Sequence, residues 1–194
     1  MATNGQTLTT LLAEDVDAGF TELVRIHAST VHAYLHRVSG SAADADDLGQ
    51  DTLLRAYTAL RTYPPQRRRD LHVRTWLLTI ATNVWRNHVR TRTRRPDTVA
   101  RLDEAAGAWA DDAPGPEEHA ANAEQRRRLV IALTELPERH RIPVVLRHIV
   151  GLSYAEVAQV QGCPVGTAKA QVARGVVSLR SLLGDTDSPE EVTA

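Results

Sequence analysis

Residues 152–175, LSYAEVAQVQGCPVGTAKAQVARG, constrain the fold most, because they predict two short helices joined by a tight turn. Ser153 and Glu156 have the spacing of a capping box, in which a hydroxyl and a carboxylate satisfy the free N–H groups where a helix begins. Gly162 ends the first helix, and Pro164 stands where the second begins. The pattern predicts a helix-turn-helix, a motif that places its second helix in the major groove of DNA.

The second helix of this pair has an apolar face and a polar face. Apolar side chains recur at helical spacing and predict a buried stripe: Val165, Ala168, Val172, Val176 and Leu179. Thr167, Gln171 and Arg174, flanked by Lys169, offer donors to base edges and phosphates, and the helix start at Pro164 can hold a phosphate. The alternative is a helical hairpin whose polar face is merely solvated.

Composition favours an all-α protein in a reducing compartment. Aromatic residues make up 4% of the 194 residues, and the apolar/polar alternation of strands is scarce. The single cysteine, Cys163, excludes an intramolecular disulfide framework. The first twenty residues lack the pattern of a signal peptide, and no apolar run approaches the length of a membrane span. We therefore expect a cytoplasmic protein.

The net charge of −1 conceals strongly charged blocks. Residues 1–60 carry a net charge of −5, residues 61–95 of +9, residues 96–125 of −7 and residues 126–180 of +6. Basic blocks attract nucleic acid because phosphate contacts release counterions, although a run of charge is often only a solvated face. Two basic blocks, one of which contains the helix-turn-helix, favour nucleic-acid binding.

Apolar periodicity and turn residues predict two small helical domains joined by a flexible acidic linker. The first domain, residues 15–95, has one helix that ends near Gly40, a second from Ser41 to about residue 60, an arginine-rich loop, and a third from about residue 73.

Residues 96–123 are rich in Ala, Asp, Glu, Pro and Gly and predict the linker. The second domain, residues 124–183, has predicted helices over 125–136 and 137–150 before the helix-turn-helix. Pro143 should kink the second of these helices.

Three segments together resemble one family. They are ADADDLGQDTLLRAY (43–57), RTWLLTIATNVWRNHVRTRTRR (74–95) and LPERHRIPVVLRHIVGLSYAEVAQVQGCPVGTAKAQVARG (136–175). In this order, they resemble the extracytoplasmic-function sigma factors of the bacterial sigma-70 family. The resemblance covers about residues 20–183. It implies a subunit that binds core RNA polymerase and promoter DNA, needs no cofactor, and in many relatives is held inactive by an anti-sigma factor.

The first segment resembles the helix that grips the clamp of core polymerase. The resemblance implies polymerase contacts for Asp47, Leu48, Gln50, Asp51, Leu53 and Leu54. The polar members and Leu54 lie three or four residues apart, a stripe that suits a partner helix. Leu48 and Leu53 are equally expected as core residues. Gly49 is unusual for this helix and should cost about 1 kcal/mol relative to alanine.

The second segment resembles the helix that recognises the minus-ten promoter element, and the loop before it resembles one that captures a flipped base. The resemblance implies DNA contacts for Arg69, Asp70, Arg74, Asn83, Arg86, Asn87 and Arg90. Such a site needs a snug base pocket and a positive wall for the single strand. Asn83 has the alternative of a structural hydrogen bond, and Asn87 replaces the aspartate usual in the family.

The third segment resembles the domain that reads the minus-thirty-five element. The resemblance implies DNA contacts for Pro164, Thr167, Lys169, Gln171 and Arg174. Gln171 stands where the family often has arginine, which predicts a different preferred sequence. The linker resembles one that threads the polymerase cleft toward the RNA exit path, and its alternative is a solvated tether.

Other function classes have weaker support. A stand-alone helix-turn-helix regulator explains residues 152–175 but not the arginine-rich loop or the acidic linker. No nucleotide-binding glycine loop or nucleophile elbow is present, so an enzyme is not expected. His32 and His36 lie one helical turn apart but have no evident third ligand, so no metal site is expected.

Overall fold

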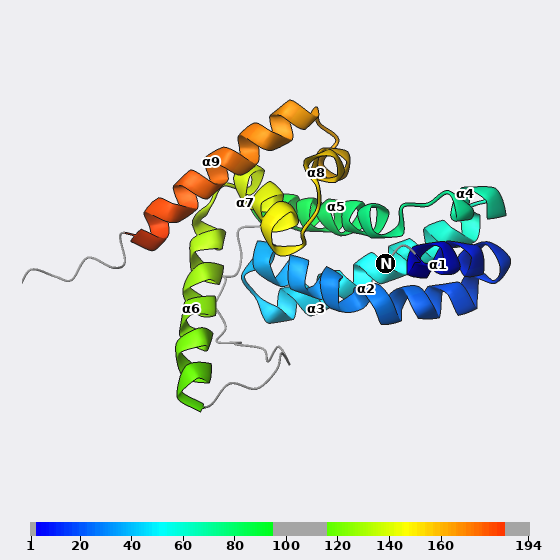
Figure 1. Ribbon diagram of the computed structural model, residues 1–194, viewed down its shortest axis with the longest axis horizontal. Helices are drawn as coiled ribbons and strands as arrows, with labels where there is room; N and C mark the ends of the chain where they lie inside the picture. Colours follow the sequence, from blue (N-terminus) through cyan, green and yellow to red (C-terminus); the bar gives the residue numbers. More distant parts are fainter. Residues whose placement is uncertain (1–2, 95–115, 185–194) are drawn as a thin grey trace, which may run out of the picture.

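The computed structural model describes residues 3–94 and 116–184, and all regular structure in these two ranges is helical (Figure 1). The prediction of an all-α protein is therefore confirmed. None of the helices in these ranges is long and apolar enough to cross a membrane.

The N-terminal half is a bundle of five helices. They are α1 (Thr3–Glu14), α2 (Val16–Ser39), α3 (Ala42–Thr62), α4 (Pro65–Arg69) and α5 (Val73–Arg94). The α2–α3 turn follows the predicted chemistry: Gly40 has a positive φ of 74°, and the Ser41 hydroxyl accepts a hydrogen bond from the Asp44 N–H at 3.1 Å. Helix α5 begins at Val73, where the sequence predicted its start.

Helices α1 and α4 were not predicted. Helix α1 lies against α2 and α4 and buries Leu8 and Leu12. Its close approach depends on Gly19 of α2, since a Cβ there would lie 2.6 Å from the Cα of Leu12. Helix α4 spans five residues within the predicted arginine-rich loop, with Pro65 at a position that suits the first turn of a helix. The loop prediction was therefore wrong over these residues.

The C-terminal half contains a second helical group. Its elements are α6 (Pro116–Glu135), α7 (Glu138–Val144), the π-helix η1 (Val145–Ile149), α8 (Tyr154–Gln161) and α9 (Val165–Gly184). Helix α6 begins nine residues before the predicted residue 125 and includes the last eight residues of the predicted linker. Residues 96–115, the rest of the predicted linker, lie outside the described ranges, so the structure does not test that part of the prediction.

The predicted kink at Pro143 takes the form of a change of helix type. Proline has no N–H to donate, so the regular i to i−4 ladder is broken at this residue. The helix widens into η1 within two residues, and the Val150 N–H donates to the carbonyl of Val145, five residues earlier, at 3.0 Å.

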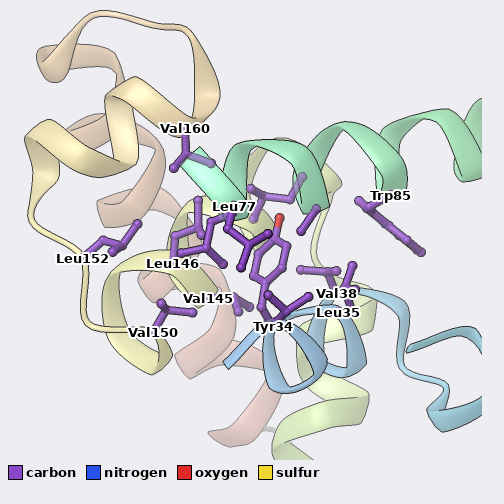
Figure 2. Packing of buried hydrophobic residues seen from close by; sticks show 14 of the residues in the cluster. Tyr34, Leu35, Val38, Leu77, Trp85, Val145, Leu146, Val150, Leu152 and Val160 are labelled. Carbon is purple, nitrogen blue, oxygen red and sulfur yellow. The ribbon is translucent and has the colours of Figure 1, made fainter. Parts of the chain in front are cut away.

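The hydrophobic core runs without interruption from one half to the other. Tyr34 and Val38 of α2 and Val145 and Leu146 of η1 are all fully or almost fully buried, and they crowd together in Figure 2. The Tyr34 hydroxyl lies 2.7 Å from the Thr82 hydroxyl of α5, and burial raises the pKa of this phenol. The buried polar group is thus paired where α2 and α5 meet.

Polar contacts also join the two halves. The Arg141 guanidinium of α7 donates to the Val38 carbonyl at 2.6 Å, and burial lowers the pKa of Arg141. Beside it, Gly40 lies directly against Thr134 of α6. The end of α2 therefore contacts the end of α6.

Two glycine substitutions should change stability in opposite directions. Gly49→Ala places a methyl group where nothing lies within 4 Å and should stabilise the protein by about 0.5–1 kcal/mol, because alanine favours a helix interior. Gly19→Ala should destabilise it, because its methyl group would meet the α1 backbone. Urea unfolding followed by circular dichroism measures both; equal effects of the same sign would contradict the close α1–α2 packing.

Candidate nucleic-acid interface

The helix-turn-helix has the predicted geometry. The Ser153 N–H donates to the Glu156 carboxylate at 2.7 Å, and the Glu156 N–H donates to the Ser153 hydroxyl at 3.3 Å. These bonds to Ser153 hold the pKa of Glu156 below its usual range. Gly162 ends α8 with a φ of 66°, which favours glycine. The capping box and the turn are therefore confirmed.

Helix α9 packs closely on α7 and turns its polar face away from the core. A Cβ at Gly175 would lie 2.5 Å from a methyl carbon of Val144, so this small residue sets the distance between the two helices. The predicted DNA contacts Pro164, Thr167, Lys169 and Arg174 are exposed. They form a surface that a duplex can reach.

Gln171 differs from its neighbours on α9 because it is half-buried. Its side-chain oxygen accepts a hydrogen bond of 3.0 Å from the amide of Gln161, at the end of α8. The side chain of Gln171, a predicted DNA contact, therefore points toward α8.

Helix α5 presents a row of polar side chains. Asn83, Asn87 and Arg90 are exposed, and Arg90 donates to the Asn87 side chain. The exposure of Asn83 favours a surface role over the alternative of a bond inside the bundle. Arg86 is held instead by the C-terminal half: its guanidinium lies 3.4 Å from the Gln161 side chain and 3.7 Å from the Glu138 carboxylate.

A cavity of about 630 Å³ lies where the loop before α5 faces α8. The predicted loop residues Arg69, Asp70 and Arg74 line it, together with Glu156 and Gln159 of α8. Asp70 accepts a hydrogen bond from Gln66 at 3.2 Å, and Arg74 donates to the Val150 carbonyl. The structure thus brings the three predicted loop residues together around one hollow.

The predicted polymerase-binding face of α3 is exposed for most of its length. Asp47 and Gln50 are exposed, and Leu54 is 64% exposed, the most exposed of the large apolar side chains described. Asp51 is half-buried and accepts a hydrogen bond from Arg55 at 2.8 Å. Leu54 is thus a single exposed apolar side chain among polar neighbours on this face.

Leu48 and Leu53, for which a core role was the alternative, are less exposed than Leu54. Leu48 is only 6% exposed and belongs to the core, so its predicted polymerase contact is not available in this structure. Leu53 is half-buried and packs against the same core. The sequence left both roles open for Leu48 and Leu53, and the structure places both of them against the core.

The paired histidines are held by a carboxylate. His32 lies 3.1 Å from Asp46, and its ring stacks on that of His36. Burial lowers the pKa of His36. Within the described ranges, no cluster of three or more His, Cys, Asp or Glu side chains has the geometry to hold a metal ion.

Sequence reasoning missed the support that α1 gives to the loop. The Arg68 guanidinium of α4 donates to the Leu12 carbonyl of α1 at 2.9 Å, and Leu8 and Thr9 of α1 line the same cavity as Asp70. Gly19 could have indicated a close helix crossing, but no signal in the sequence identified Arg68 among its arginine neighbours.

Family models match both halves of the chain. The model of sigma-70 region 2 matches residues 23–95, and the model of sigma-70, region 4, matches residues 126–179. The chain thus has the two regions of a sigma-70-type transcription factor.

Individual proteins narrow this class. The chain is 34% identical to the ECF RNA polymerase sigma factor SigE of Mycolicibacterium smegmatis over 86% of its own length and 62% of that protein. It is 31% identical to the ECF RNA polymerase sigma factor SigW of Bacillus subtilis over 88% of its own length and 91% of that protein. The chain belongs to the extracytoplasmic-function sigma factors.

A solved structure has the same fold. It is the sigma factor RpoE of Bartonella quintana in complex with the anti-sigma factor NepR, which matches with a TM-score of 0.67 at 24% identity. The match covers 87% of this chain and 98% of that one.

Removal of the hydrogen bond between α4 and α1 should lower the free energy of unfolding. Arg68→Met retains the aliphatic stem but removes the donor to Leu12, and we expect a loss of about 1 kcal/mol in the free energy of unfolding. Arg69→Met, at the exposed neighbouring position, is the matched control and should change it by less than about 0.5 kcal/mol. Equal losses in urea unfolding would contradict the bracing role of Arg68.

Proposed function

We propose that this chain is a promoter-specificity subunit that binds core RNA polymerase through α3 and opens the minus-ten element with α5 and the loop before it. The observation that carries the proposal is the cavity beside α5, where Arg69, Asp70 and Arg74 meet next to the exposed row of Asn83, Asn87 and Arg90. A hollow beside a basic helix suits the capture of an extruded base, which a regulator that binds only duplex DNA does not need.

In strand opening, the cavity would hold an extruded base, and helix α5 would bind the unpaired strand. A base extruded from the duplex needs a pocket that replaces its stacking contacts, and the cavity of about 630 Å³ has room for one. The unpaired strand needs cations along its backbone, which Arg86 and Arg90 supply one helical turn apart. Asn83 and Asn87 add amide groups that can donate to and accept from bases.

The second surface would hold the duplex upstream. Thr167, Lys169 and Arg174 project from α9, and Pro164 lies at its exposed beginning. A helix of this kind contacts base edges through its N-terminal residues, while lysine and arginine fix its register on the phosphates. This surface would read the minus-thirty-five element.

Helix α3 would make the polymerase contact. Asp47, Gln50 and Asp51 surround Leu54 on one face, so an apolar anchor has a polar rim, the usual anatomy of a protein interface. The relatives named as RNA polymerase sigma factors support this assignment. Acting on the polymerase places the protein in the cytoplasm, with promoter DNA and polymerase as its partners.

Run-off transcription with purified bacterial core polymerase on genomic promoter fragments tests the proposal. We expect specific initiation that depends on this protein. Arg86→Ala combined with Arg90→Ala should reduce it at least about 100-fold while core binding persists, because two cations that hold the open strand are lost. Arg127→Ala combined with Arg128→Ala is the matched control, because both arginines are exposed on α6 and belong to none of the assigned surfaces.

Leu54→Asp tests the polymerase contact separately. A charge at an interface anchor should weaken binding to core polymerase by at least about 2 kcal/mol, measured by fluorescence anisotropy, without change in the unfolding midpoint. An unchanged protein that neither binds core polymerase nor directs initiation, but footprints duplex DNA on its own, would instead be a conventional regulator.

A further inference from the structure

We propose that Val165, the first residue of α9, reads a thymine of the minus-thirty-five element through the methyl group of that base. This inference rests on the proposed function, because it needs α9 to lie in the major groove of promoter DNA. It adds to that surface an apolar specificity residue and the identity of one base.

Val165 is exposed, although the sequence predicted it in the buried stripe of α9. Ala168 is 0% exposed and Val172 is 1% exposed, as predicted, but Val165 is 43% exposed. A Cβ at the next residue, Gly166, would have no neighbour within 4 Å. The first turn of α9 therefore extends beyond the packed part of the helix, and the prediction was wrong for Val165.

The first four residues of this exposed segment carry no charge. Residues 164–167, which we call the tip of α9, are Pro, Val, Gly and Thr, and all four are exposed. Lys169 is the first charged side chain of the helix, and its ammonium lies 5.8 Å from the centre of the Tyr154 ring, at the start of α8. A base edge that meets the tip is therefore read by uncharged groups.

The turn before α9 holds the tip in a fixed position. Gly162 ends α8 with a φ of 66°, and the Cys163 N–H donates to the Ala158 carbonyl at 3.0 Å. The Cys163 side chain packs against the core. Helix α9 begins directly after this turn, at the outer edge of the molecule (Figure 1). Because valine in a helix has one strongly preferred rotamer, the Val165 side chain is ordered before DNA arrives.

The chemistry of the major groove identifies the base. A recognition helix contacts base edges through its N-terminal residues. In the major groove the edges present donors and acceptors, and the methyl group of thymine is the apolar feature among them. Valine leaves a donor or acceptor without a partner, which is unfavourable, whereas its contact with a methyl group removes apolar surface from water. Val165 therefore favours thymine over the other three bases.

Position distinguishes Val165 from other exposed apolar residues. A single exposed valine is common on protein surfaces and needs no partner. Val177, which is 63% exposed, lies on the same helix beyond Arg174 and outside the assigned DNA contacts. Val165 instead lies between Pro164 and Thr167, both assigned to DNA. Val177 is thus the matched control for Val165.

Replacement of thymine by deoxyuridine tests the contact, because it removes the methyl group and leaves base pairing unchanged. A promoter fragment is first selected by run-off transcription with core polymerase from a library randomised upstream of the start site. Each thymine of its minus-thirty-five element, on either strand, is then replaced singly by deoxyuridine. Binding of the protein–polymerase complex to each fragment is measured by fluorescence anisotropy.

We expect one thymine whose replacement weakens binding about fourfold, the effect of leaving one methyl group unburied. Val165→Ser removes both methyl groups of the side chain, so it should reduce this penalty to less than about 1.5-fold. Val177→Ser should bind as the unchanged protein does and retain the full penalty. Circular dichroism checks that both variants keep the unfolding midpoint, and the measurement on the unchanged protein depends on neither variant.

Two results would overturn the inference. One is a selected element in which no deoxyuridine weakens binding of the unchanged protein, an element without thymine included. The other is a penalty that persists in Val165→Ser, which would assign the methyl group to another side chain or to the shape of the duplex. In both cases the chain still selects promoters, so the proposed function stands; a chain that binds no polymerase and selects no promoter would refute that function, and this inference with it.

Discussion

The packing of α2 against α5 and η1 is the constraint on which the rest of the structure depends. Tyr34 lies at its centre, fully buried, with its hydroxyl paired to Thr82. An unpaired buried hydroxyl is costly, so this pair favours the rotation of α5 that places Thr82 toward α2. That rotation decides which side chains of α5 face solvent: Trp85 enters the core, and Asn83, Asn87 and Arg90 remain outside. The packing and hydrogen bonding of the core thus determine which side chains of α5 are exposed and can reach nucleic acid.

Sequence reasoning succeeded where local chemistry decides the structure. Ser153 and Glu156 form their capping box, and Ser41 caps α3, because these bonds join residues only three apart. It failed where a distant contact decides. Helix α1 is stabilised by burial of Leu8 and Leu12 against α2 and α4, and a single short apolar cluster has too few turns to show a period.

Predictions about the candidate site also succeeded where they depended on local spacing and failed where they depended on distant contacts. The resemblance supplied the residues of each surface, and their exposure on α3, α5 and α9 agrees for most of them. It could not show that Leu48 is core, nor that Gln161 binds Arg86 and Gln171, since both depend on elements far apart in the chain. The charge blocks pointed to two DNA-binding halves but gave no sign that these halves are joined by an apolar interface.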